Sequence, residues 1–215
     1  LTSLCAFLSI VVVLSGCGSS GTTATTTQQP QQTQSGQLSP SADPSGQLQT
    51  FSSAGTVDFS SDFFVDLGTN GRDCSTCHQP NDGWTVSAAD VQARFNSSNG
   101  NDDIFRPVDG SDCPNDDVST FAAKQAAYSL LLSRGVIRVS RPIPAGADFA
   151  LSSVSDPYNC VATNGLSLYR RPLPTTNLPF EVSIMWDTRE VIPGSPLSQE
   201  LSNQAAHATE THAQG

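Results

Sequence analysis

The chain has 215 residues, of which 14% are charged, and its 20 acidic residues outnumber its 10 basic ones to give a formal net charge of -10. A protein that follows nucleic-acid phosphates needs a basic run, and the sequence has none, so that class is not expected. No apolar stretch after residue 14 approaches the ~20 residues of a membrane span, which argues against a polytopic membrane protein.

The first 17 residues are typical of an export signal. Residues 1–14 are mostly apolar but too few to span a membrane comfortably, and Leu14-Ser15-Gly16-Cys17 resembles a bacterial lipobox. This pattern predicts lipidation of Cys17 and an exported lipoprotein anchored on the periplasmic side, at the outer membrane in our expectation. A plain secretory signal or a short anchor is the alternative. Because Met and a basic segment do not precede this stretch, we expect the sequence to be truncated at its N-terminus.

Residues 18–57 are rich in Ser, Thr, Gln and Pro and have few large apolar side chains. Such a segment cannot bury enough surface to offset the entropy lost on ordering, so we expect a disordered tether. Residues 58–215 are then the folded domain, with a last helix that is expected still to be running where the sequence stops.

The folded domain contains a C-x-x-C-H motif, Cys74-Ser75-Thr76-Cys77-His78. On one helical turn, thiols at i and i+3 share a face and can each add to one vinyl group of the same porphyrin. The motif therefore predicts covalent haem c, with His78 as an iron ligand. Half of a zinc site and a thioredoxin-type redox pair are the alternatives, but no second C-x-x-C and no βαβ pattern accompany the motif.

Hydrophobic periodicity predicts mostly helices with two short strands. Together with the haem motif, this gives the expected fold class: mainly α, a cytochrome c-like haem domain with a short β-hairpin insertion and long irregular loops. An acidic segment, residues 97–118, is expected to be a solvated loop, with a calcium site as the weaker alternative because EF-hand spacing is missing. The expected helices cover residues 61–67, 88–95 (capped by Ser87), 120–134 (ended by Gly135) and 195–213, and the expected strands are centred on 137–139 and 149–151.

Cys113 and Cys160 remain once the haem and lipid cysteines are assigned. Outside the cytoplasm, two spare cysteines are most simply joined, so we predict a disulfide between them.

From about Phe63 onward, the chain resembles the N-terminal haem half of the bacterial di-haem cytochrome c peroxidases. Four motifs carry the resemblance in order: Leu67–His78 around the haem motif, Arg170–Asn177 (RRPLPTTN), Met185–Arg189 (MWDTR, where the family has W-D-G-R) and Leu201–Ala205 (LSNQA). The ordered series is more specific than the haem motif alone, which many cytochromes share.

The resemblance implies roles for four further residues. Trp186 matches the aromatic residue that lies between the two haems, and Gln204 matches a polar residue near the peroxidatic haem. Arg170 and Arg171 are expected to pair with haem propionates, since a guanidinium fork matches a carboxylate. Ordinary core packing is the alternative for Trp186, and a solvated loop is the alternative for the two arginines.

Three departures qualify the resemblance. The family carries a second C-x-x-C-H that this sequence does not contain, Thr188 stands where the family has Gly, and no His precedes Arg170. We therefore expect a second haem domain to follow residue 215.

The sixth iron ligand has few candidates because the chain has one Met and three His. Helical spacing puts His212 on an apolar stripe with Leu201, Ala205 and Ala208, while His207 falls off the stripe and should face solvent. We favour His212 over Met185 as the ligand.

Two functions follow from these features. The first is a haem c electron-transfer protein that forms the front part of a peroxide-reducing oxidoreductase and takes electrons from a donor protein or a second haem domain. The second is a tethered single-haem relay without catalytic activity.

Overall fold

A computed structural model describes residues 36–41, 48–158, 160 and 166–210. The chain divides into two units, Leu1–Gln34 and Ser35–Gly215, and the first lies outside the described residues. The predictions for the signal segment, for lipidation of Cys17 and for His212 also fall outside them. No helix in the described ranges has both the length and the apolar character that a membrane crossing requires.

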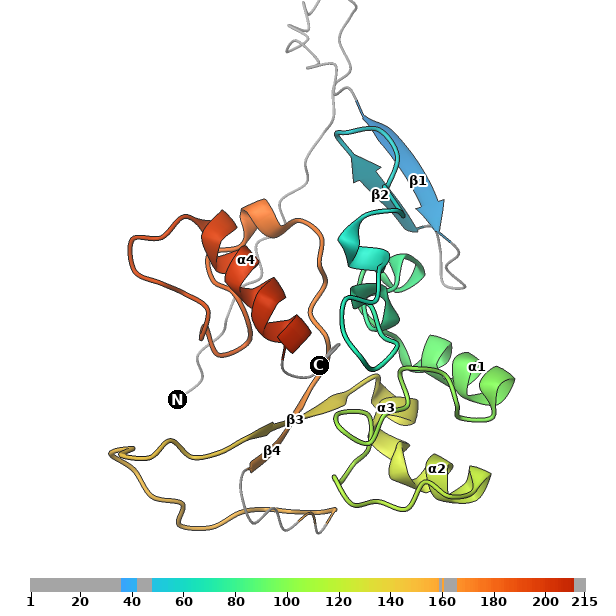
Figure 1. Ribbon diagram of the computed structural model, residues 1–215, viewed down its shortest axis with the longest axis vertical. Coiled ribbons are helices and arrows are strands. Elements are labelled where there is room, and N and C mark those ends of the chain that lie inside the picture. The colour runs from blue at the N-terminus through green and yellow to red at the C-terminus, as the bar shows by residue number, and fades with distance from the viewer. Residues whose placement is uncertain (1–35, 42–47, 159, 161–165, 211–215) are drawn as a thin grey trace, which may run out of the picture. The chain divides into compact units, whose positions relative to one another are not determined.

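The expectation of a mainly α, cytochrome-like fold is wrong. Of the residues that the structure describes, 31% are helical and 13% are in strands, with four short α-helices and two small antiparallel sheets (Figure 1). In the described residues, the helices are α1 (Ala88–Ser98), α2 (Phe121–Ala127), α3 (Ser129–Arg134) and α4 (Leu197–Ala208), the strands are β1 (Gln37–Ser41), β2 (Leu48–Ser52), β3 (Ile137–Arg141) and β4 (Leu166–Arg170), and the 3-10 turns are η1 (Asp62–Phe64), η2 (Cys74–Thr76), η3 (Pro80–Asp82) and η4 (Leu178–Phe180).

Side chains that compete with the backbone explain why the helices are short. The helix expected over residues 61–67 is only η1, because the Asp66 carboxylate accepts the amide of Gly68 in a local turn. The helix expected over residues 120–134 breaks at Tyr128, where the Asp112 carboxylate accepts the Leu130 amide at 3.0 Å and so caps a new helix, α3.

Other helix ends agree with the sequence. The Ser87 hydroxyl accepts the Asp90 amide at the start of α1, and Gly135 ends α3 with a φ of +60°, as predicted.

The two sheets correct two further expectations. β1 pairs with β2 inside the segment expected to be a disordered tether, and Thr50 of β2 accepts a 2.8 Å hydrogen bond from the indole of Trp84, which ties this hairpin to the folded part. β3 pairs with β4, not with residues 149–151, and Phe149 and Leu151 are instead exposed. Tyr169 of β4 stabilises the observed pairing because its hydroxyl donates to the Asp112 carbonyl at 2.9 Å.

The main core lies between α1 and α3. Phe105 contacts both Phe95 and Tyr128 through its ring, with centroids 5.1 and 5.2 Å apart, and the Tyr128 hydroxyl donates to the Phe105 carbonyl. The buried members of this cluster are Val86, Val91, Phe95, Ile104, Phe105, Tyr128, Leu131 and Ile137.

The acidic segment is not simply a solvated loop. Asp109 and Asp112 are 3% and 5% exposed, respectively. Asp109 forms a two-pronged ion pair with Arg72, at 2.9 and 3.0 Å, and both side chains are almost fully buried. This pair joins the segment just before the C-x-x-C-H motif to the acidic segment.

Candidate functional site

The C-x-x-C-H motif forms a compact turn, which we call the attachment turn (residues 73–78). Asp73 caps it, since its carboxylate accepts the Thr76 amide at 2.8 Å while the Thr76 hydroxyl accepts the Asp73 amide. The amides of Cys77 and His78 both donate to the Cys74 carbonyl, at 3.3 and 3.1 Å. Local hydrogen bonds therefore fold the turn that carries both thiols.

The imidazole of His78 is oriented by the backbone. Its Nδ1 lies 3.0 Å from the carbonyl oxygen of Trp84, and since a carbonyl can only accept, Nδ1 carries the hydrogen. The lone pair of that tautomer is on Nε2. This arrangement is typical of metal-ligating histidines, in which one ring nitrogen donates to a carbonyl and the other is a ligand.

Trp84 organises the surroundings of His78. It is 8% exposed and has a φ of +62°, an unfavourable backbone conformation for a residue other than glycine. Its carbonyl also accepts the Thr175 amide at 3.1 Å, and Thr85 donates to the Pro172 carbonyl, so the Arg170–Asn177 motif runs beside the attachment turn. Phe63 packs its ring near both Trp84 and His78, with centroids 5.7 and 6.3 Å away.

Two arginines lie beside the attachment turn, and each is fixed by an aspartate. Arg94 of α1 donates to the Thr76 carbonyl at 2.8 Å and is itself fixed by both oxygens of Asp102. Arg72 precedes the turn and is held by Asp109.

Both thiols of the motif are shifted toward the neutral form. Burial, followed by the Asp109 carboxylate, raises the pKa of Cys77 to about 12 against the opposing effect of Arg72 and Arg94. Burial, followed by Asp73, also raises the pKa of Cys74. A redox-active C-x-x-C pair needs a lowered thiol pKa, so these environments argue against the thioredoxin-type alternative.

The zinc alternative has no support in the described residues, where no group of three or more His, Cys, Asp or Glu side chains could hold a metal ion. The six aspartates of the acidic segment likewise do not form such a group there. A haem needs fewer protein ligands, because the porphyrin supplies the other nitrogens to the iron.

Arg170 is the last residue of β4, and Arg171 follows it; both begin the Arg170–Asn177 motif that borders Trp84. The Nε of Arg170 is buried and has no hydrogen-bond partner within the described ranges, and the same holds for Oγ1 of Thr175. Arg171 is exposed and donates to the Arg134 carbonyl at 2.6 Å. A partly buried guanidinium with an unused donor fits a carboxylate ligand such as a haem propionate.

Trp186 is not a core residue. Its side chain is 60% exposed, and its indole donates to the Arg171 carbonyl at 3.2 Å. Two neighbouring residues, Met185 and Thr188, have left-handed φ values of +69° and +56°. Met185 and Gln204 are half-buried, and neither makes a hydrogen bond to the attachment turn among the residues described.

α4 only partly follows its expected pattern. His207 is exposed, as predicted, and its Nδ1 donates to the buried Glu190 carboxylate at 2.9 Å. However, Ala205 is exposed and the buried residue of the helix is Glu200, which accepts the Ile192 amide. The apolar stripe that favoured His212 as a ligand is therefore not the buried face of α4.

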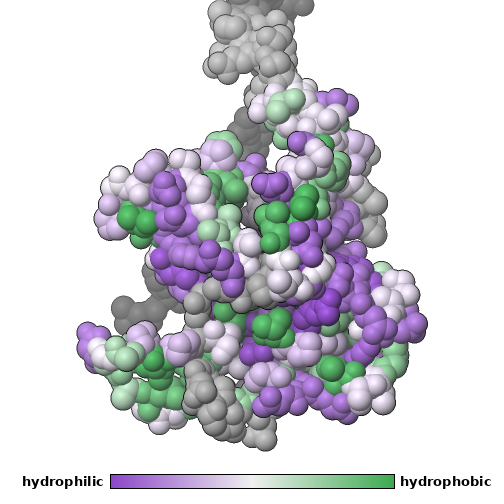
Figure 2. All heavy atoms as spheres, viewed as in Figure 1, coloured by the Kyte–Doolittle hydropathy of each residue, from purple (hydrophilic) through white to green (hydrophobic). Residues whose placement is uncertain are grey.

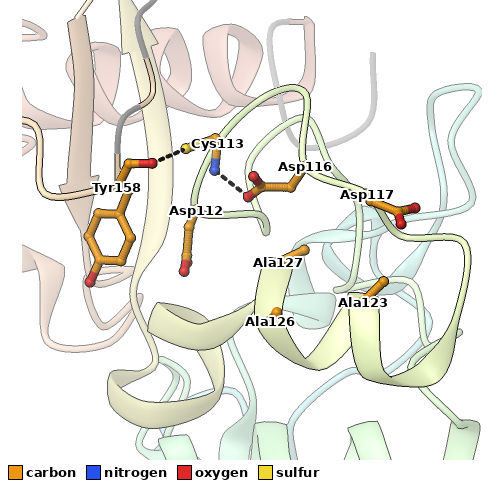
Figure 3. A pocket seen from close by; sticks show the side chains of 8 residues that line it. All are labelled: Asp112, Cys113, Asp116, Asp117, Ala123, Ala126, Ala127 and Tyr158. Carbon is orange, nitrogen blue, oxygen red and sulfur yellow. Dashed lines mark hydrogen bonds between the residues drawn. The ribbon is translucent and has the colours of Figure 1, made fainter.

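A disulfide joins Cys113 to Cys160, with Cα atoms 5.1 Å apart. Beside it lies an open pocket of about 250 Å³, whose lining comes from the acidic segment, from alanines of α2 and from Tyr158 (Figure 3). Asp116 turns back to accept the Cys113 amide at 2.7 Å. None of the lining residues belongs to the attachment turn, so this pocket is separate from the site at His78.

Sequence reasoning missed the residues that hold the turn. Arg72, Arg94 and Asp109 act through contacts between distant segments, and the acceptor for His78 is a backbone carbonyl that any residue could supply.

Comparisons with protein-family models, with curated proteins and with solved structures found no match.

Proposed function

We propose that this protein binds haem c covalently through Cys74 and Cys77, with His78 as an iron ligand, and transfers electrons. The observation that carries the proposal is the hydrogen bond from Nδ1 of His78 to the Trp84 carbonyl, because it fixes the tautomer that ligates through Nε2. Bound haem would supply a one-electron couple at its iron.

The chain's own residues suit a porphyrin in several ways. The Phe63 ring lies near the imidazole and also packs on Trp84, and Arg170 has an unused donor for a propionate among the described residues. Cys77 is partly buried and packs against the core cluster, which restricts access to its thiol once the chain has folded. Covalent attachment is therefore expected before or during folding, in the exported compartment.

The finer proposal is that the chain is the N-terminal haem part of a peroxide-reducing di-haem oxidoreductase. Two observations support it. Thr188 has a left-handed φ at the position where the peroxidase family has Gly. The indole of Trp186 is exposed, as expected of a residue that would contact a second haem domain. A single-haem relay anchored through lipidated Cys17 is the alternative.

The haem proposal is tested on protein produced with a c-type maturation system. We expect a pyridine haemochrome spectrum of two thioether links and haem that acid-acetone does not release. His78→Ala should change the spin state and the reduction potential of the iron. The control His207→Ala also removes a hydrogen-bonded imidazole and should leave the spectrum unchanged. Haem released by acid-acetone would refute covalent attachment.

Peroxide separates the two functions. An oxidoreductase would have to let peroxide reach the bound iron, so the reduced protein should be oxidised rapidly by peroxide and its ferric spectrum should include a high-spin species. A six-coordinate spectrum that neither Met185→Leu nor peroxide alters would favour the relay.

A further inference from the structure

The β1–β2 hairpin faces the rest of the domain through one side of β2. Thr50 lies in the middle of this half-buried side, between Leu48 and Ser52, whereas the residues on the opposite side of the strand are exposed. The Thr50 hydroxyl oxygen accepts the indole hydrogen of Trp84, with Oγ1 and Nε1 2.8 Å apart. The alternation along β2 therefore directs this hydroxyl group at the residue whose carbonyl orients His78.

The loop that leads from His78 to Trp84 is closed by two backbone hydrogen bonds. Gln79 and Thr85 form an isolated antiparallel bridge, in which the Gln79 amide donates to the Thr85 carbonyl at 2.8 Å. The Trp84 amide donates back to the Gln79 carbonyl at 2.8 Å. A movement of Trp84 is therefore passed directly to the carbonyl oxygen that lies 3.0 Å from Nδ1 of His78.

Trp84 depends on its side-chain contacts because its backbone conformation is unfavourable by itself. Its φ of +62° lies in the left-handed region, and such a conformation persists only where the surrounding structure holds it. Phe63 and Phe64 of η1 pack edge-on to the indole, with ring centroids 5.7 and 6.2 Å away. Figure 2 shows hydrophobic side chains gathered near η1 and bordered by hydrophilic ones. Apolar packing alone lets the indole turn, whereas the hydrogen bond to Thr50 is directional and fixes it.

We propose that Thr50 is a positioning residue for the iron ligand His78. Its hydroxyl holds the indole of Trp84, and the Trp84 carbonyl in turn holds the Nδ1–H of the imidazole. This inference rests on the proposed function, and it makes the β1–β2 hairpin part of the support of the haem ligand. A hydrogen bond from Nδ1 increases the basicity of the ligating Nε2, and a more basic ligand favours ferric iron. Thr50 therefore lowers the reduction potential of bound haem by acting through Trp84 and His78.

The test measures the Nδ1–H of His78 by NMR in the full-length chain with isotope-labelled histidine, since the chain has only three imidazoles. Thr50→Val removes the hydroxyl and keeps the branched side chain. We expect the His78 Nδ1–H to exchange with solvent about fivefold faster, as the loss of one ordinary hydrogen bond predicts. In haem-loaded protein, Thr50→Val should also raise the reduction potential. Thr50→Ser keeps the hydroxyl and should restore both wild-type values.

Thr209→Val is the matched control. Thr209 is also half-buried, and its hydroxyl also makes a hydrogen bond, to the Ala205 carbonyl at 2.9 Å. This variant should change neither the exchange of the His78 Nδ1–H nor the reduction potential. Amide exchange in α1 and α3 separates a local effect from a general loss of stability, because a general loss speeds exchange in those helices as well.

Trp84→Phe removes the other partner of the same hydrogen bond, so adding Thr50→Val to it should have no further effect on His78. Unchanged exchange of the His78 Nδ1–H in Thr50→Val, or an equal acceleration in α1 and α3, would overturn the positioning role. The exchange measurement does not require haem. A preparation without covalent haem would thus refute the proposed function, while exchange at His78 in the same chain would still decide the role of Thr50.

Discussion

At the scale of single residues, the turn around Trp186 is the clearest case of a backbone that conflicts with its sequence. Thr188 has a φ of +56°, in the region that glycine adopts freely and that a β-branched residue avoids. The left-handed conformation costs a residue with a Cβ roughly 1–2 kcal/mol. A glycine there would remove this cost but would lose about 0.5–1 kcal/mol through the greater freedom of the unfolded chain.

Thr188→Gly should therefore stabilise the protein by about 0.5–1 kcal/mol, the difference between these two effects. The measurement is the free energy of unfolding from urea titration. Thr209→Gly is the matched control, because Thr209 has an ordinary φ of -60° and its replacement should destabilise. If both variants destabilised equally, the left-handed conformation of Thr188 would be wrong.

The thiol of Cys77 gives a second prediction at this scale. With a pKa of about 12, Cys77 is almost entirely protonated at pH 8.5, where an ordinary cysteine is about half ionised. In the protein without haem, alkylation of Cys77 by iodoacetamide at pH 8.5 should be at least about a hundredfold slower than in the same chain in urea. Peptide mass spectrometry measures each cysteine separately.

The same shift makes stability depend on pH in a defined direction. Because the pKa of Cys77 is higher in the folded chain than in the unfolded chain, the contribution of this thiol to stability is fully present below the unfolded-state pKa and is lost as the pH rises toward about 12. Fast alkylation of Cys77 in the folded chain would contradict the raised pKa of its thiol.

At the scale of elements, the attachment turn depends on a buried ion pair as well as on its own hydrogen bonds. Arg72 and Asp109 are 37 residues apart, and their side chains are 2% and 4% exposed. Removing one partner of such a pair leaves an uncompensated buried charge, which typically costs about 3–5 kcal/mol.

Asp109→Asn should therefore lower the free energy of unfolding by roughly 3 kcal/mol or more. Asp103→Asn is the control, since it breaks an exposed ion pair with Arg106 and should cost about 1 kcal/mol or less. Chemical denaturation of both variants under one set of conditions gives the comparison. Equal small losses would mean that the Arg72 charge finds another partner.

Sequence patterns predicted the local parts of this structure better than the distant ones. Ser87 and Gly135 mark helix ends because capping and left-handed φ are local properties. The break at Tyr128 could not be read from periodicity, since the carboxylate that causes it belongs to Asp112 in another segment. The β1–β2 hairpin was missed because the composition of its segment indicates disorder, whereas the bond from Trp84 to Thr50 is a tertiary contact.

The candidate site also contains residues that the sequence reveals and others that only the tertiary structure reveals. Cys74, Cys77 and His78 are recognisable because the chemistry of thioether attachment fixes their spacing. The Trp84 carbonyl and the guanidinium of Arg94 leave no signature in sequence, since the one is a backbone atom and the other is brought to the turn by α1.

At the scale of the whole molecule, the Cys113–Cys160 disulfide joins the acidic segment to the chain just before β4. This end of the chain leads through β4 to Arg170 and then to the motif that borders Trp84. The bond has a sequence separation of 47, so it closes a long loop. By the chain-entropy estimate, a loop of this length stabilises the folded state by roughly 4 kcal/mol.

The variant Cys113→Ala, Cys160→Ala should unfold at a lower urea concentration, with a loss of roughly 4 kcal/mol, because its unfolded chain is no longer constrained. Reduction of the wild-type protein with dithiothreitol should produce a similar loss and should leave the variant unchanged, which separates the disulfide from the loss of two buried side chains. Mass spectrometry of non-reduced peptides checks that the two cysteines are joined in protein purified without a reductant. Free thiols at both positions, or a wild type that reduction does not destabilise, would contradict the prediction. In a haem-loaded preparation, the proposed function further predicts that reduction loosens the β4 segment and shifts the haem spectrum.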